Sequence, residues 1–346
     1  MRTKNIKIKQ KSFGFHQQKE VFVLSLENDH GMRLRVTNFG ASIMSLDVPD
    51  ISGGYTNVVA GFDSITDYIQ KSKNKESKFL GASIGRYAGR ISNKKIEINN
   101  IDYPLYHEEG VHLHGGEHGF DESVWEIAYI DDDQSAITLS YQSEDMEEGY
   151  PGNLNVKVIY QLTNDNELKI TYHAVSDQDT IVNLTNHAYY NLNGEDSIKD
   201  HTLQLNCSKF VDVDEKQLPT GILKPVVGTK YDFLVSKGLH KLEPDNIIDN
   251  AFVFDPEQEA KATLMSERTG IRMDILTNQP AVVIYTVEEF PDWDFRKGIA
   301  YTAFPAICFE TQNFPDAPNY DHFPSAFLKA GEFYENSSTF RFSKMV

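Results

Sequence analysis

Hydrophobic and polar residues alternate with a period of two along much of this chain. The clearest example is the segment 153–176, where Val156, Val158 and Tyr160 fall on one face of a predicted strand. Successive side chains of a β-strand point to opposite faces, so this alternation is typical of a strand with one buried face. The turn-forming sequence Asn164-Asp165-Asn166 divides the segment, which therefore predicts a β-hairpin.

Shorter runs of the same kind predict strands over most of the remaining chain. They occur at residues 20–27, 31–37, 95–98, 124–130, 135–142, 180–192, 201–206, 262–265, 271–276, 281–287, 305–311 and 338–343. Helical periodicity is scarce, and one short helix is expected near residue 65 with Ser64 as its N-cap. Many strands with few helices favour an all-β fold, a large antiparallel β-sandwich.

The chain is long enough for two domains, but large all-β folds of this length also occur as one. We find no internal repeat and no low-complexity linker. The candidate site residues described below come from both halves of the chain. We therefore expect a single domain over residues 1–346.

Charge and composition restrict the class of partner. The net charge of -18 repels phosphate backbones, so we expect no nucleic-acid partner. Cys207 and Cys308 are the only cysteines and make no CxxC pair, which favours a reducing, cytoplasmic setting. No apolar run reaches transmembrane length, and the first residues lack the apolar stretch of a signal peptide. The sequence therefore predicts a cytoplasmic protein without a membrane partner, as a monomer or homodimer.

The segment from Asn183 to Leu192 combines a histidine with amides and aromatic rings. If it is one strand, His187, Tyr189 and Asn191 share a face. Such a face suits a sugar, whose hydroxyls need hydrogen bonds and whose C–H groups stack on rings. A core histidine satisfied by a main-chain carbonyl is the alternative. The amide-rich neighbourhood favours the site over a dry core.

Glu310 follows the apolar run Ala306-Ile307-Cys308-Phe309 and precedes a loop rich in aromatic residues and proline. Burial of this carboxyl would raise its pKa toward neutrality, as a general base requires. A solvated charge at a strand end is the alternative.

Two further charged residues are candidate sugar ligands. Arg90 follows the glycine-containing segment 85–89, and its fork of N–H groups can donate to ring or hydroxyl oxygens. Asp249 stands between apolar residues and can accept hydrogen bonds from hydroxyls, or cap a turn.

The sequence His112-Leu113-His114-Gly115-Gly116-Glu117 raises the question of a metal. An HxH pair with a following glutamate is used in cupin-type metal sites. Here the two glycines break the strand, and Glu117 falls too close to the pair. We therefore expect no metal, and expect His114 alone to face the site. Phosphate-binding, dinucleotide-binding and Gly-x-Ser-x-Gly motifs are absent, so no cofactor is predicted.

Taken together and in order, these motifs resemble the aldose 1-epimerase (galactose mutarotase) family over nearly the whole chain. The matching landmarks are Asn38-Phe39-Gly40-Ala41, Gly61-Phe62-Asp63-Ser64, the Arg90 segment, His114-Gly115-Gly116, Gly119-Phe120-Asp121, the His187 segment, Asp249-Asn250-Ala251-Phe252, the Glu310 loop and Gly331-Glu332-Phe333-Tyr334.

The resemblance implies a large antiparallel β-supersandwich with an open sugar cleft. It implies that Glu310 is the general base and His187 the general acid in opening and closing the ring of galactose or glucose. It further implies that the sugar is bound by Arg90, His114 and Asp249, with Tyr189 and Asn191 beside them. No metal or nucleotide is implied.

Two departures from the family bear on substrate preference. Gly89 stands where asparagine is common, and Val283-Ile284 are aliphatic where glutamine or an aromatic residue is often found. Three alternatives stay open: a non-catalytic sugar-binding protein on the same fold, a cupin-like metalloenzyme, and an epimerase of phosphorylated hexoses. The last needs a basic phosphate subsite, and no Lys/Arg cluster flanks these motifs.

Overall fold

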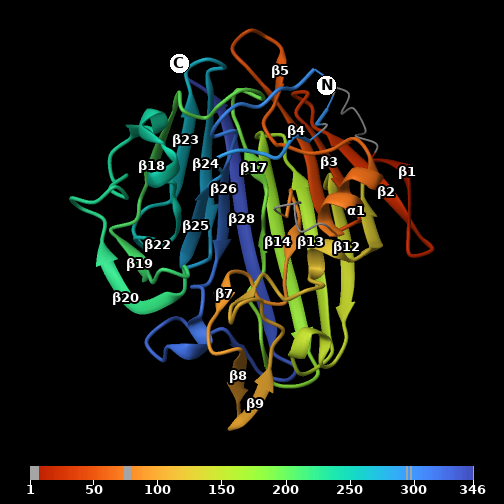
Figure 1. The fold of residues 1–346 in the computed structure, drawn as a ribbon. Helices are drawn as coiled ribbons and strands as arrows, with labels where there is room; N and C mark the ends of the chain where they lie inside the picture. Colours follow the sequence, from red (N-terminus) through yellow and green to blue (C-terminus); the bar gives the residue numbers. More distant parts are fainter. Residues whose placement is uncertain (1–7, 74–78, 294, 297, 346) are drawn as a thin grey trace.

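Antiparallel sheets make up most of the protein in a computed structural model, which describes residues 8–73, 79–293, 295–296 and 298–345 (Figure 1). The predicted all-β class is confirmed. Among the described residues, no helix is long and apolar enough to cross a membrane.

The largest sheet has nine strands. In spatial order they are β11 (Glu126–Asp131), β12 (Ala136–Ser143), β13 (Leu154–Leu162), β14 (Glu167–Ser176), β28 (Phe333–Lys344), β24 (Ile271–Thr277), β23 (Ala262–Ser266), β18 (His201–Leu205) and β21 (Lys237–Gly238). The predicted hairpin is confirmed as β13 and β14, which pair Val156 with Ala174 and turn at residues 163–166. Buried and more exposed positions alternate along both strands, as a sheet with one covered face requires.

The second sheet has six strands and carries the candidate site. Its order is β17 (Tyr189–Tyr190), β26 (Ile307–Gln312), β25 (Ala281–Thr286), β22 (Asp249–Val253), β19 (Lys209–Val213) and β20 (Pro219–Pro225). One face of this sheet packs on the nine-stranded sheet: Ile284, Phe309 and Phe340 belong to one buried cluster, and the Tyr190 ring stacks on Phe340 at 5.3 Å. The opposite face is therefore available for a site.

Smaller elements complete the fold. A five-stranded sheet runs β1 (Lys9–His16), β2 (Lys19–Glu27), β3 (Arg33–Thr37), β4 (Ser42–Pro49) and β5 (Tyr55–Asn57). The two-stranded pairs are β6 (Ser83–Ile84) with β16 (Thr185–Asn186), β7 (Arg90–Ile91) with β10 (His112–Leu113), β8 (Lys95–Ile98) with β9 (Ile101–Pro104), and β15 (Thr180–Ile181) with β27 (Phe327–Leu328). The β8–β9 hairpin projects at one end of the molecule (Figure 1).

The helical elements are few and short. They are α1 (Ile65–Lys73) and the 3-10 turns η1 (Phe120–Glu122), η2 (Glu147–Gly149), η3 (Leu239–Lys241), η4 (Pro244–Asn246) and η5 (Ala317–Asn319). The predicted cap of α1 is confirmed, because the Ser64 hydroxyl accepts a hydrogen bond from the main-chain N–H of Thr66 at 3.1 Å.

The predicted strand 180–192 is wrong as a single element. The structure divides it into β15, β16 and β17, so His187 lies between two strands. The cause is hydrogen bonding of its asparagines to an irregular neighbouring segment: Asn183 donates to the carbonyl of Ala88, and Asn186 to that of Gly81. Side-chain amides thus replace part of a regular ladder here.

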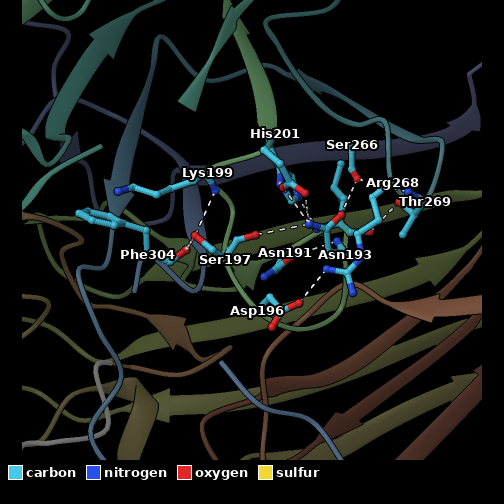
Figure 2. A network of polar contacts seen from close by, with 12 residues as sticks. Asn191, Asn193, Asp196, Ser197, Lys199, His201, Ser266, Arg268, Thr269 and Phe304 are labelled. Carbon is cyan, nitrogen blue, oxygen red and sulfur yellow. Dashed lines mark hydrogen bonds and ion pairs between the residues drawn. The ribbon is translucent and has the colours of Figure 1, made fainter. Parts of the chain in front are cut away.

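The loop that follows β17 is held by a buried polar network (Figure 2). The Asn193 amide donates to both carboxylate oxygens of Asp200 at 2.8 and 3.0 Å and accepts from the Ser266 hydroxyl of β23 at 2.5 Å. His201 accepts from the main-chain N–H of Leu192. The network thereby ties the end of the His187 segment to the nine-stranded sheet.

We predict that Asn193→Ala lowers the free energy of unfolding by about 2–3 kcal/mol, because it leaves the buried Ser266 hydroxyl without its acceptor and removes two hydrogen bonds to the Asp200 carboxylate. Arg268→Ala is the control. It removes two ion pairs of the same loop, with Glu195 and Asp196, that are about half exposed, and we expect a cost of about 1 kcal/mol or less. Urea denaturation measures both. Equal losses for the two variants would contradict the structural role given to Asn193.

Candidate active site

A cavity of about 240 Å³ lies on the face of the six-stranded sheet that is turned away from the nine-stranded sheet. Residues from both halves of the chain line it: Phe79, Gly89, Arg90, Leu113, His114, His187, Tyr189, Val211, Val213, Gln217, Pro219, Asp249, Asn250, Ala251, Val283, Tyr285, Glu310 and Pro315. The structure thus brings six of the seven predicted site residues together.

Strand register explains why Glu310 and Asp249 face the same cavity. Val283 of β25 is paired with Glu310 on one side and with Ala251 on the other. Asp249 is paired with Tyr285, two residues further along β25. Because side chains alternate between faces, both rows project from one side of the sheet.

Glu310 is a buried carboxyl at the base of this cavity. Its side chain is 2% exposed, and among the described residues its Oε2 atom has no hydrogen-bond partner. Burial, together with the negative charge of Asp249, raises the pKa of Glu310 to about 8, and Arg90 opposes this effect. The alternative of a solvated strand end is therefore wrong. The orphan oxygen is positioned to accept a hydrogen bond from a bound hydroxyl.

His187 faces Glu310 across the cavity floor. Its Nε2 atom lies 3.5 Å from Oε1 of Glu310, and its side chain is 5% exposed. The Tyr189 ring stacks on the imidazole with centroids 5.1 Å apart, and Phe79 packs against it at 5.6 Å. Burial lowers the pKa of His187 to about 4. At neutral pH these two shifts favour an uncharged pair, in which the carboxyl of Glu310 is protonated and the imidazole of His187 is neutral.

This distribution differs from the protonated His187 that its implied role as general acid requires. The physical reason is that a charged imidazole and a charged carboxylate both lose hydration when they are buried. An uncharged pair avoids that cost with the same number of protons. The Glu310–His187 pair thus supplies one donor and one acceptor in either arrangement.

His114 faces the cavity as a hydrogen-bond donor. The main-chain N–H of Gly89 donates to its Nδ1 at 3.2 Å, so the proton of the neutral ring lies on Nε2. Burial, followed by the neighbouring His187 and Arg90, lowers the pKa of His114 well below its usual range. His112 points elsewhere and contacts the carbonyl of Tyr106 and the hydroxyl of Tyr150.

A metal cluster is geometrically conceivable but chemically ill matched. One ligand atom each of His114, His187 and Glu310 lie within 4.8 Å of one another, and all three residues are buried. A neutral imidazole ligates through a nitrogen lone pair. In His114 the lone pair is engaged by Gly89 and the other nitrogen carries the proton. Ligation by His114 would therefore require loss of that main-chain hydrogen bond, so the described donors fit a metal poorly.

Arg90 and Asp249 form an ion pair at the side of the cavity. Nη2 of Arg90 lies 3.5 Å from Oδ2 of Asp249, and both side chains keep about a quarter of their surface exposed. Each retains unused hydrogen-bonding capacity toward the cavity. The pair therefore offers donors and an acceptor side by side, as adjacent hydroxyls require.

Asn191 does not reach the cavity. Its amide donates to the main-chain carbonyls of Glu195 and Pro305 at 3.0 and 2.7 Å, and it lies within the loop network of Figure 2. Strand β17 ends at Tyr190, so the alternation on which the predicted place of Asn191 depended does not extend to it. The prediction that Asn191 shares a face with His187 and Tyr189 is thus wrong.

Several lining residues escape sequence reasoning. Phe79 lies in a turn with a φ of 59°, outside any helix or strand, so no periodic pattern indicates it. Tyr285 shares a strand face with Val283, which the alternation along residues 281–287 signals. Gln217 comes from the turn between β19 and β20, and among the described residues its buried Oε1 has no partner.

The structure distinguishes the residues at which the sequence departs from the family, Gly89 and the pair Val283-Ile284, by whether they line the cavity. Val283 lines the cavity, whereas Ile284 is buried in the core on the other face. Gly89 has a φ of +83°, and an added Cβ would lie 3.0 Å from Pro315. A side chain at position 89 would thus be strained by both its backbone conformation and its neighbour.

Comparison with known proteins agrees with this geometry. The family model for aldose 1-epimerase matches residues 23–341. A galactose mutarotase of Bos taurus is 36% identical over 92% of this chain and 93% of its own length, and an aldose 1-epimerase of Haemophilus influenzae is 34% identical over 92% and 95%. The crystal structure of an aldose epimerase homologue from C. elegans superposes with a TM-score of 0.87, at 30% identity over 94% of this chain and 99% of that one.

The chain therefore belongs to the aldose 1-epimerase family, which makes it an isomerase. The resemblance seen in the sequence and the galactose mutarotase-like fold are both confirmed.

The raised pKa of Glu310 predicts how stability depends on pH. Its folded pKa of about 8 lies above the ordinary 4.5, so its contribution to stability is full below pH 4.5 and is lost as pH rises to about 8. The lowered pKa of His187 acts below pH 6.5, where stability falls toward pH 4. Between pH 6.5 and 8, wild type should lose up to about 1.4 kcal/mol per pH unit relative to Glu310→Gln. Urea denaturation across this window measures the difference, and a constant difference would contradict the burial of an ionisable Glu310.

Proposed function

We propose that this protein interconverts the α and β anomers of free hexoses such as galactose and glucose. The observation that carries the proposal is the buried Glu310–His187 pair, 3.5 Å apart at the base of a cavity that also presents Arg90, His114 and Asp249. A carboxyl and an imidazole that share one proton can remove and supply protons at two oxygens of one substrate.

The reaction begins at the anomeric hydroxyl. Glu310 accepts its proton while Nε2 of His187 donates a proton to the ring oxygen, and the bond between C1 and O5 breaks. The product is an open-chain aldehyde. Rotation about the C1–C2 bond presents the other carbonyl face, and the same groups then act in reverse to close the other anomer. Every proton that leaves one group returns to it, so no cofactor is consumed.

This direction requires the shared proton to lie on His187 when the sugar is bound. Arg90 favours that arrangement, because its positive charge lowers the pKa of Glu310. Hydroxyls that hydrogen-bond to the carboxylate act in the same sense. We infer that substrate binding moves the proton from Glu310 to His187.

The remaining polar groups orient the sugar. Asp249 accepts from hydroxyls, Arg90 donates to oxygens beside it, and the Nε2–H of His114 donates into the cavity. The Tyr189 ring stacks on His187, so its role is to hold the imidazole in place and not to contact a distant part of the sugar. Val283 and Gly89 supply no polar side chain, so Asp249, Arg90 and His114 orient the sugar.

Phosphorylated hexoses are disfavoured as substrates. Of the described residues that line the cavity, Arg90 is the only lysine or arginine, and it is already paired with Asp249. A phosphate group carries close to two negative charges and calls for several donors. We also propose that the enzyme acts in the cytoplasm on small free sugars, since neither of its two cysteines forms a disulfide and its net charge is -18.

We predict that His187→Asn and Glu310→Gln each lower kcat by about a hundredfold or more while sugar binding persists, because each removes one proton-transfer partner. Anomer interconversion followed by optical rotation measures turnover, and calorimetry measures binding. The matched controls are His118→Asn and Glu122→Gln, which alter a histidine–glutamate pair 3.3 Å apart outside the cavity. Near-normal kcat in either site variant would refute the role of that residue.

We predict that Asp249→Asn raises KM about tenfold with a smaller effect on kcat, because it weakens charge-assisted hydrogen bonds to the sugar. Steady-state kinetics over a range of galactose concentrations tests this. An unchanged KM would show that Asp249 does not bind the substrate.

A further inference from the structure

The imidazole of His187 has a second polar neighbour, at the nitrogen that faces away from Glu310. Sγ of Cys308 lies 3.5 Å from Nδ1 of His187, which is hydrogen-bonding distance for sulfur, and Cys308 is fully buried. The sequence suggests only a small apolar residue in a buried strand. The structure shows that this thiol touches the proposed acid.

One strand places both neighbours of the imidazole. Cys308 and Glu310 are two residues apart on β26, so their side chains project from the same face. Oε1 of Glu310 lies 3.5 Å from Nε2, and Sγ of Cys308 lies 3.5 Å from Nδ1. Cys308 is also the cross-strand partner of Tyr189, whose ring stacks on His187. Two side chains of β26, Cys308 and Glu310, therefore contact the edge of the imidazole ring, and Tyr189 of β17 covers one of its faces.

Packing alone settles where the ring lies but not which nitrogen carries the proton. A neutral imidazole has a single N–H, and the partner of one nitrogen decides the state of the other. Nδ1 has an acceptor within reach, the sulfur of Cys308 at 3.5 Å. Nε2 lies 3.5 Å from Oε1 of Glu310, a carboxyl that can donate a proton to its lone pair. Both ends thus favour a proton on Nδ1 and a lone pair on Nε2.

We propose that Cys308 is a positioning residue for the reaction, whose sulfur accepts a hydrogen bond from Nδ1–H of His187 and so keeps Nε2 as the nitrogen that exchanges its proton with Glu310 and the sugar. This inference rests on the anomer interconversion proposed above. It adds a residue that acts through His187 and does not itself touch the substrate.

A thiol suits this place better than a carboxylate. In serine-protease triads a buried aspartate holds the equivalent nitrogen and stabilises the charged imidazolium. Sulfur is a weak acceptor and carries no charge as a thiol, so it orients the proton with little increase in the basicity of the ring. Ring opening and ring closure each transfer this proton, so a group that bound it too strongly would slow the reaction in both directions.

The first experiment records the nitrogen resonances of His187 in uniformly 15N-labelled wild-type protein, assigned by their loss in His187→Asn. We expect Nδ1 to have the shift of a protonated nitrogen and Nε2 that of an unprotonated one at neutral pH. Protonation of Nε2 alone would overturn the proposal, whatever the variants do. This result does not depend on turnover, so it remains decisive if wild type fails to interconvert anomers and the proposed function falls.

The second experiment compares Cys308→Ala and Cys308→Ser, with Cys207→Ala as the control, since Cys207 is a buried cysteine of the core outside the cavity lining. We expect Cys308→Ala to lower kcat about five- to tenfold, with KM within about twofold, as the loss of one hydrogen bond allows. The pH profile of kcat should shift, and the His187 resonances should show a mixture of tautomers.

Cys308→Ser restores an oxygen acceptor and should recover part of kcat, and Cys207→Ala should leave kcat and its pH profile unchanged. A Cys308→Ala variant with wild-type kcat, pH profile and tautomer would show that the thiol only fills space. If Cys308→Ala fails to fold, the serine variant and the wild-type spectrum still decide: a serine variant with the opposite tautomer and full kcat would overturn the proposal.

Discussion

Burial of two ionisable groups against one another is the interaction on which the site depends. Glu310 and His187 lie 3.5 Å apart, and both are almost inaccessible to water. Burial opposes charge on each, so the pKa of the carboxyl rises and that of the imidazole falls. The result is an uncharged pair that shares one proton, which the two shifts place on Glu310 rather than on His187. Such a pair can act as base toward one oxygen and as acid toward another, which ring opening and ring closure both require.

The six-stranded sheet makes this burial possible because one of its faces packs in the core and the other lines the cavity. The face with Ile284 and Phe309 packs on the nine-stranded sheet and supplies rigidity. The other face presents Asp249 and Glu310 in register, and loops from distant parts of the chain close over it. The polar network after β17, centred on Asn193, fixes the end of the segment that brings His187 to the sheet. Strand register and satisfied main-chain hydrogen bonds thus fix the positions of the side chains in the site.

Local pattern was enough to predict the strand-rich fold and the hairpin of β13 and β14, because period-two alternation is a property of each segment by itself. Glu310 could be singled out because a carboxyl after an apolar run is unusual. Alternation misplaces Asn191 because β17 ends at Tyr190, and the Asn191 amide is held by the carbonyls of Glu195 and Pro305 instead. Phe79 lies in a loop without periodicity, and the contact of Cys308 with His187 joins residues 121 positions apart. Only tertiary structure reveals such neighbours.

Polarimetry on freshly dissolved α-D-galactose, with wild-type protein that has been treated with a chelator, measures anomer interconversion directly. We expect the rotation to decay faster than in buffer and to reach the same final value, because the protein speeds both directions and needs only its own side chains. Decay at the buffer rate with galactose and with glucose would contradict catalysis of anomer interconversion by the Glu310–His187 pair. Acceleration that disappears on chelation and returns with added metal would contradict the metal-free mechanism.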